Sequence, residues 1–243
     1  MKNIFSLYKL RMKETIKNAV LVIPAVLLLA FLGIMYSIRP VQVSGSFLIS
    51  GIFLFVLATY IANSIQEKEN DVHEEILLLH SNSSLNYYIS REMVLIGVIL
   101  IFAAVLIAYP AIRSLINSSN FTRPMEKEDV IWGGLIVLGN GLCGIAVGDL
   151  CHQRIVFTRR YRLTAVFCII IITICKTPLI HSFKFLTFLN YLLPPVTDGL
   201  TMVGNTDYFD GAGSTMIFIH TLIFLVVITI LKIKILKFKK YNN

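Results

Sequence analysis

Residue types that often carry out catalysis are scattered along this chain of 243 residues. Of its five histidines, only His73 and His80 share one face of a predicted helix, and that face points away from the membrane. The four cysteines have neither C-x-x-C spacing nor the spacing of a zinc site, so we interpret them as small apolar packing residues. We find no Ser/His/Asp arrangement and no pair of carboxylates inside a predicted membrane span. These patterns predict neither a catalytic centre nor a metal site.

A Walker A motif, G-x-x-x-x-G-K-[ST], is absent from the sequence. In proteins that have this motif, its backbone amides and lysine hold the phosphates of ATP. If ATP drives this protein, the ATPase is therefore another polypeptide. We expect no cofactor on this chain, with ATP and Mg²⁺ bound by the partner.

The longest polar interruption in the first half of the chain is 66–92. It holds 6 of the 14 acidic residues, and charge at this density belongs in water rather than in lipid. Val72, Ile76 and Leu79 recur at i, i+4 and i+7, as on one face of a helix. The acidic residues lie in its first turns, where they suit the positive end of the helix dipole. We predict a short amphipathic helix between two membrane spans and expect it to bind another protein.

The chain as a whole is strongly apolar, with 56% hydrophobic and 15% charged residues. Soluble domains carry about 25% charged residues, and several apolar runs here approach the ~20 residues that cross a bilayer. The first run begins near Ala19 without a clear signal-peptide cleavage site, so we interpret it as a retained span. We predict an all-α polytopic membrane protein, with a single transmembrane domain over 1–243. Its six spans are expected at about 19–37, 46–65, 92–113, 130–150, 163–180 and 215–233.

Lysines and arginines flank the apolar runs unevenly. If the N-terminus is placed inside, 16 of the 22 basic residues lie on the inner side of the six-span layout. The positive-inside rule then predicts that both termini are cytoplasmic. We therefore interpret the net charge of +8 as a sign of membrane orientation. We expect a multi-pass protein of the plasma membrane that does not bind nucleic acid.

The N-terminal residues 3–17 carry two neighbouring stripes at helical spacing. The apolar stripe is Phe5, Tyr8, Met12 and Ile16, and the basic stripe is Lys9, Lys13 and Lys17. Basic residues beside aromatic ones suit the headgroup layer of an anionic leaflet. We predict an amphipathic helix that contacts membrane lipid.

The span at 130–150 is rich in glycine. Gly144 and Gly148 form a small-xxx-small pair, which lets two helices approach closely. Asn140 lies near mid-depth, and we expect it to find a hydrogen-bond partner on another helix. Asp149 lies at the inner end, where we favour a solvated helix end over the alternative of a buried functional carboxylate.

The region after the loop 151–162 is less regular. Lys176-Thr177-Pro178 interrupts the outer third of the span at 163–180. The stretch 183–203 is apolar but is broken by several residues, including Lys184, Pro194 and Pro195. We predict that it dips into the outer leaflet as a re-entrant stretch packed against protein.

This layout resembles the ABC-2 family of ABC transporter permease subunits, in its small six-span type. The resemblance covers essentially the whole chain. Its local match is to the family pattern E-R/K-E…GTLE-x-LL-x-x-P. The pattern corresponds here to Glu67-Lys68-Glu69 followed by Glu74-Glu75-Ile76-Leu77-Leu78. His73-Glu74 replaces the Gly-Thr of the pattern, and Asn82 stands near its proline.

The resemblance implies that 67–80 is a coupling helix, resting in a groove of a separate ATPase subunit. The residues that it assigns to coupling are Glu67, Glu69, Glu74, Glu75, Ile76, Leu77 and Leu79. It also implies that the Pro194-Pro195 region belongs to an outer re-entrant hairpin. Two permease chains would face each other as a homodimer or heterodimer and move when ATP closes the ATPase.

The apolar, aromatic-rich spans suit a hydrophobic or amphipathic cargo. Small permeases of this family resemble exporters of peptides, bacteriocins or drugs, and the sequence leaves export and self-immunity both open. Two other classes are alternatives. An ion-coupled carrier would need ionisable residues within its spans, where only Asn140 is clearly polar. An integral-membrane enzyme would need a polar cluster at one depth, so we expect no enzymatic activity.

Overall fold

The computed structural model describes residues 2–68, 77, 84–152, 155, 158–204 and 206–241. Within these ranges the chain is helical, and one isolated backbone bridge joins Val41 to Phe121. The first six elements are α1 (Lys2–Lys17), α2 (Val22–Met35), α3 (Val43–Lys68), α5 (Ser84–Ile116), η1 (Ser118–Asn120) and α6 (Lys127–Leu150). The others are α7 (Arg159–Ile174), α8 (Lys176–Ser182), η2 (Lys184–Phe188), α9 (Leu189–Leu192), α10 (Asp198–Val203) and α11 (Gly211–Tyr241).

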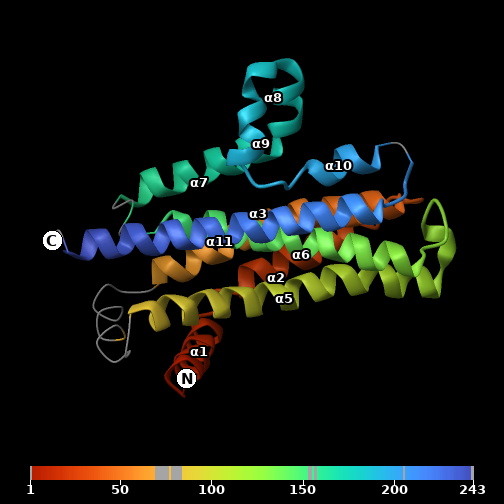
Figure 1. Cartoon of the computed structure of the whole chain (residues 1–243). Helices are drawn as coiled ribbons and strands as arrows, with labels where there is room; N and C mark the ends of the chain where they lie inside the picture. Colours follow the sequence, from red (N-terminus) through yellow and green to blue (C-terminus); the bar gives the residue numbers. More distant parts are fainter. Residues whose placement is uncertain are drawn as a thin grey trace.

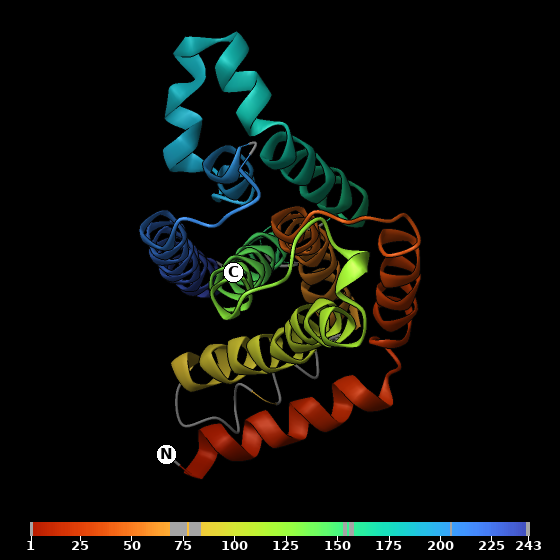
Figure 2. The same cartoon turned by 90° about the vertical axis from the view of Figure 1, so that its right-hand side faces the viewer.

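The four long helices α3, α5, α6 and α11 lie side by side along the length of the molecule (Figure 1). In the view down the bundle, α6 lies between the other three and contacts each of them (Figure 2). Among the described residues, these four helices are each long and apolar enough to cross a membrane. The expectation of an all-helical, multi-pass membrane protein agrees with this architecture.

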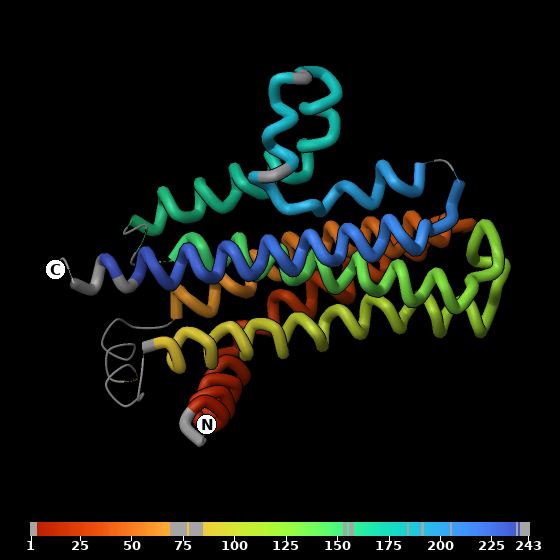
Figure 3. Tube along the Cα trace, in the orientation of Figure 1, coloured from red at the N-terminus to blue at the C-terminus, as the bar shows by residue number. Residues whose placement is uncertain are grey.

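The ends of α3, α6 and α11 and the start of α5 lie together at one end of the bundle (Figure 3). We call this the inner end and the opposite one the outer end. The helices are longer than the spans predicted at 46–65, 92–113 and 215–233. An apolar window marks only the part that suits lipid, whereas the helix continues through flanking polar residues. In α5 the helix also continues through Pro110.

Two pairs of helices could each form one bent span. The axes of α1 and α2 differ by 69°, and those of α7 and α8 differ by 62°. The second bend falls between Ile174 and Lys176, at the polar break that the sequence indicated. Helix α2 alone has 14 residues, or about 21 Å, which is less than the ~30 Å of a hydrocarbon core. The described residues therefore contain four candidate spans, or up to six if each bent pair counts as one.

Helix α1 packs across α5 near the inner end (Figure 2). Its buried stripe is Leu7, Arg11 and Thr15, at i, i+4 and i+8. Phe5 and Ile16, from the predicted apolar stripe, are 69% and 62% exposed. The helix therefore presents one face to the bundle and a separate apolar face to its surroundings.

Helices α8 and α9, with η2 between them, form a hairpin that stands away from the bundle (Figure 1). Its phenylalanines Phe183, Phe185 and Phe188 are exposed. The first half of the predicted re-entrant stretch 183–203 therefore does not pack against the rest of this chain. Pro194 and Pro195 are buried where the chain returns to the bundle.

Candidate functional site

Six polar side chains meet inside the bundle at its inner end. Five of them are at most 2% exposed, and the sixth, Glu92, is 12% exposed at its side chain. We call this set the inner network: Gln66 of α3, Arg91 and Glu92 of α5, Asp149 of α6, His152 after α6, and Lys232 of α11. The set brings together residues from four helices.

Asp149 is the centre of the inner network. Its Oδ1 accepts a hydrogen bond from Gln66 Nε2 at 2.6 Å and lies 3.0 Å from Arg91 Nη2. Its Oδ2 forms an ion pair with Lys232. Gln66 Nε2 also donates to the carbonyl of Gly148 at 3.3 Å. One carboxylate therefore joins α3, α5, α6 and α11.

The network extends from both of its cations. Lys232 forms a second ion pair with Glu92, and Arg91 Nη1 lies 2.7 Å from Nε2 of His152. Because a guanidinium has only donors, Nε2 must accept, which requires a neutral histidine with its proton on Nδ1. Arg91 and Lys232 are the basic members of the network, and Asp149 and Glu92 are its acidic members. Removing one side chain of a buried ion pair would leave its partner uncompensated, which is strongly destabilising.

The expectation that Asp149 is a solvated helix end is wrong, since this residue is 2% exposed. The carboxylate lies one residue before the end of α6, but α5 and α11 continue past it and cover it. Its partners come from positions far away in the sequence. The buried alternative is the observed one.

Two described residues of the acidic segment 66–92, Glu67 and Leu77, contact other parts of the chain. Glu67 accepts hydrogen bonds from Arg159 at 3.2 Å and from Arg162 Nη2 at 2.8 Å, which joins α3 to α7. Leu77 is buried in a cluster with Leu7, Tyr87, Tyr88 and Leu236. Both side chains thus contact the chain itself. The other residues assigned to coupling, Glu69, Glu74, Glu75, Ile76 and Leu79, lie outside the described residues.

The two glycines singled out in α6 lie against α3. A Cβ atom on Gly144 would lie 2.4 Å from the carbonyl oxygen of Phe55, and one on Gly148 would lie 2.6 Å from that of Thr59. Thr59 Oγ1 bridges the two helices by donating to the carbonyl of Gly144 at 3.1 Å. Only glycine permits this distance between the two backbones.

Asn140 Nδ2 donates to the backbone oxygen of Val196 at 3.2 Å. The partner therefore lies in the link between α9 and α10 and not on another helix as expected. Lys176 Nζ lies 2.5 Å from Asp198, so an ion pair joins α8 to α10; the lysine side chain is 1% exposed and the aspartate side chain 32%. Both contacts hold the base of the hairpin onto the bundle.

At the outer end, Asp207 holds the start of α3. Its carboxylate accepts hydrogen bonds from the backbone N–H groups of Val43 and Ser44 at 3.3 and 2.8 Å, and from the Ser44 hydroxyl at 2.6 Å. Thr122 Oγ1 donates to it at 2.7 Å. Burial raises the pKa of Asp207, but these hydrogen bonds outweigh burial and hold the pKa below its usual value.

Arg123 links Asp207 to Asp129 at the start of α6. Its Nη2 donates to the backbone oxygen of Asp207 at 2.7 Å, and its two terminal nitrogens donate to Asp129 at 2.8 and 2.6 Å. The Asp129 carboxylate beside it raises the pKa of this guanidinium. We call Ser44, Thr122, Arg123, Asp129 and Asp207 the outer clamp. The outer clamp was not predicted from the sequence, because its loop residues show no spacing pattern.

Among the described residues, no group of three or more His, Cys, Asp or Glu side chains is arranged to hold a metal ion. In the inner network each acid faces a cation, which suits holding helices together better than transferring a proton to a substrate.

Comparisons of the chain with protein-family models, with curated proteins and with solved structures found no match.

Proposed function

We propose that this chain is the permease subunit of an ATP-binding-cassette transporter, driven by a separate ATPase subunit. The observation that carries the proposal is that both flanks of the acidic segment are bonded to other helices. At the start of the segment, Gln66 and Glu67 bind α6 and α7. At its end, Arg91 and Glu92 pair with α6 and α11. A partner that moves this segment would therefore move most of the bundle.

The physical basis is rigid transmission between a soluble two-state element and the membrane helices. Buried, mutually bonded charges resist separation more strongly than exposed pairs do. A displacement at the segment would thus pass to α6 through Asp149 and to α11 through Lys232. In this proposal the ATPase subunit binds and hydrolyses ATP, so this chain needs no catalytic residues of its own.

In this proposal Glu69, Glu74, Glu75, Ile76 and Leu79 contact the ATPase groove. Glu67 and Leu77 hold the segment to this chain instead, because both have partners within it. Apolar side chains would anchor the segment, and the acidic ones would set its register through charge complementarity.

The membrane arrangement that we propose has six spans and both termini in the cytoplasm. Residues 19–37 and the bent α7–α8 pair each cross once, and α1 lies along the inner surface. The exposed aromatic hairpin of α8 and α9 would lie in the outer leaflet as the re-entrant element. Its exposed Phe185 and Phe188 suit lipid or the second permease chain of a dimer.

For the cargo we propose a hydrophobic or amphipathic molecule, such as a peptide, bacteriocin or drug. A groove of about 490 Å³ between α3 and α7 supports this class. Its lining is mostly apolar, and its polar members are Tyr60, Asn63 and Thr164. A largely apolar wall with few polar groups suits a cargo that is mostly apolar.

An ion-coupled carrier is the second candidate, because charged residues inside membrane helices often mark ion pathways. The buried Asp149, Glu92 and Lys232 favour it. The two candidates differ in their energy source. A carrier would move cargo in vesicles that contain this chain alone under an ion gradient, whereas a permease would need the ATPase and ATP.

The test is to purify the tagged chain from its host, identify any co-purifying ATPase, and reconstitute both in vesicles. Glu75→Lys and Ile76→Asp are expected to lose ATPase association or cargo-stimulated hydrolysis, while the chain still inserts and dimerises. Glu128→Lys is the matched control, because this acid is exposed at the outer start of α6. Wild-type association and stimulation in both segment variants would refute the proposal.

A further inference from the structure

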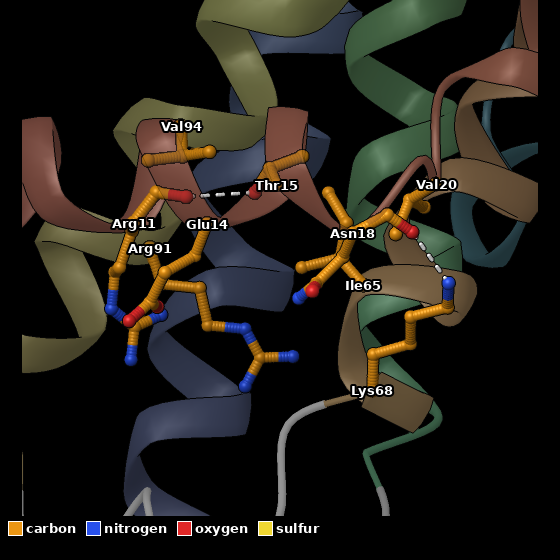
Figure 4. A pocket seen from close by; sticks show the side chains of 9 residues that line it. All are labelled: Arg11, Glu14, Thr15, Asn18, Val20, Ile65, Lys68, Arg91 and Val94. Carbon is orange, nitrogen blue, oxygen red and sulfur yellow. Dashed lines mark hydrogen bonds between the residues drawn. The ribbon is translucent and has the colours of Figure 1, made fainter.

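A cavity of about 290 Å³ lies between α1, the end of α3 and the start of α5. It sits beside the bend that separates α1 from α2, at the inner end of the bundle. Figure 4 shows Arg11 and Arg91 on one side of it, and Lys68 with Asn18 on the other. Its volume is at the lower end of the range of small-molecule sites.

The lining of this cavity is positively charged. Arg11, Lys68 and Arg91 contribute three cations, and Glu14 is the single acid among the described lining residues. Arg11 and Arg91 are 6% and 1% exposed, so two guanidinium groups are held inside the protein at the cavity wall. Guanidinium groups match the geometry of phosphate oxygens and form charge-assisted hydrogen bonds with them. The chemistry of the wall therefore suits a phosphate-bearing anion.

The contacts in the wall hold these groups in place. Lys68 Nζ donates to the backbone oxygen of Asn18 at 2.7 Å. The Arg11 guanidinium carbon lies 4.2 Å from the centre of the Tyr87 ring. The Thr15 hydroxyl donates to the carbonyl of Arg11 at 2.9 Å. Arg11, Lys68 and Arg91 belong to α1, α3 and α5, so three helices each contribute one cation to this cavity.

The position of the cavity indicates where the anion comes from. Helix α1 exposes Phe5, Leu10 and Ile16 to its surroundings, as a helix lying in the headgroup layer of a membrane does. The remaining wall includes the apolar Val20 and Val94, which suit the start of an acyl chain or glycerol unit. Basic pockets between membrane helices on the cytoplasmic side bind anionic headgroups.

We propose that this cavity binds the phosphate of an anionic phospholipid from the inner leaflet. The proposal does not depend on the transport function. Arg91 joins the cavity to the inner network through Asp149 and His152. A bound phosphate therefore adds a contact between α1 and the residues that hold α5 to α6.

The experiment measures the unfolding temperature of the purified full-length chain in detergent. Phosphatidylglycerol, phosphatidylcholine or soluble glycerol 3-phosphate is added at equal phosphate concentration. Phosphatidylglycerol is expected to raise the unfolding temperature by several degrees, and the other two are expected to have little effect. Lys68→Gln removes a cation, and Val94→Phe fills the cavity without changing charge. Each is expected to lose most of the shift given by phosphatidylglycerol.

Each variant is compared with itself without lipid, so a change in its basal stability does not affect the result. Lys13→Gln is the matched control, because this lysine is exposed on α1 and lies outside the lining; it should keep the wild-type shift. Loss of the shift in Lys13→Gln as in Lys68→Gln would show attraction to the surface of α1 and refute the site. A full shift in both Lys68→Gln and Val94→Phe would also refute it. An equal, Lys68-dependent shift with glycerol 3-phosphate would assign the cavity to a soluble phosphate ester and reject the lipid.

Discussion

Asp149 of α6 and Lys232 of α11 form an ion pair in the interior of the bundle, although 83 residues separate them in the sequence. The most apolar window of α11 is only 17% buried, so apolar packing holds this helix weakly. Its buried polar residues include Lys232, which faces the bundle. The ion pair with Asp149 therefore helps to determine where α11 lies against α6.

Removing one member of this pair is expected to destabilise the protein strongly. Lys232→Met or Asp149→Asn should each lower the free energy of unfolding by about 3–5 kcal/mol, because the remaining charge stays buried and uncompensated. The double variant should recover part of that loss, because it removes one charge of each sign, although Arg91 and Glu92 each lose a partner. Unfolding in detergent is the measurement, with Lys234→Met, on the exposed side of α11, as the control. A double variant as unstable as the sum of the singles would contradict this account.

A methyl group added at the contact between α3 and α6 is expected to separate the two helices. Gly144→Ala places a Cβ atom 2.4 Å from a backbone oxygen of α3, which side-chain movement cannot relieve. We expect a loss of about 1–3 kcal/mol, as for an overpacked core. Gly33→Ala in α2 is the matched control, because nothing lies within 4 Å of its Cβ position. There, alanine should stabilise the helix by about 0.5–1 kcal/mol.

The long helices could be predicted from sequence because apolar runs and the lipid-crossing length are local properties. The spans expected at 46–65, 92–113, 130–150 and 215–233 each fall inside a long helix of the structure. The predicted break at Lys176 also corresponds to a bend. A re-entrant hairpin was expected in this region, but the direction of the α8–α9 hairpin was not predicted, because it depends on contacts at its base, such as Lys176 with Asp198.

The inner network was missed because its pairs are tertiary. In the sequence Lys232 belongs to a basic tail and Asp149 to a helix end, and each has an ordinary explanation as a solvated charge. One signal could have found them. Arg91, Glu92, Asp149 and Lys232 all lie at the inner ends of predicted spans, hence at one depth, with two charges of each sign.

At the outer end, the stability contributed by Asp207 is expected to depend on pH. Its pKa is below the usual value because hydrogen bonds from Ser44 and Thr122 favour the carboxylate over the effect of burial. The contribution is therefore complete above the unfolded pKa, about 3.9, and is lost as pH falls from there through the lowered folded pKa. Asp207→Asn should cost about 2 kcal/mol at neutral pH, and less in strong acid. Unfolding of the variant, the wild type and Glu128→Gln from pH 7 to 3 tests this, and a pH-independent difference would contradict it.

The proposed orientation places the C-terminus of the chain in the cytoplasm. The excess of lysine and arginine at the inner end predicts that the C-terminus is cytoplasmic. A reporter that is active only outside the cytoplasm should be inactive when fused after Asn243. The same reporter inserted in the link between α5 and α6, after Ser119, should be active. The reverse pattern would exclude the proposed orientation.

The coupling energy between Glu67 and Arg162 is expected to exceed that between Glu67 and Arg159, although Glu67 binds both arginines. The Arg162 side chain is 3% exposed and lies 2.8 Å from Glu67, whereas Arg159 is 73% exposed at 3.2 Å. Exposed ion pairs contribute about 0–1 kcal/mol because water and salt screen them. A buried, hydrogen-bonded charge contributes about 1.5–3 kcal/mol.

Two double-mutant cycles measure this difference by unfolding in detergent. One combines Glu67→Gln with Arg162→Gln, and the other combines Glu67→Gln with Arg159→Gln. The first coupling energy should exceed the second by about 1 kcal/mol or more, and added salt should reduce only the second. Equal couplings would mean that Glu67 links α3 to α7 through surface charge alone. In that case Glu67 could not pass a displacement of the acidic segment to α7, and that branch of the proposed transmission would be lost while the Asp149 branch remained.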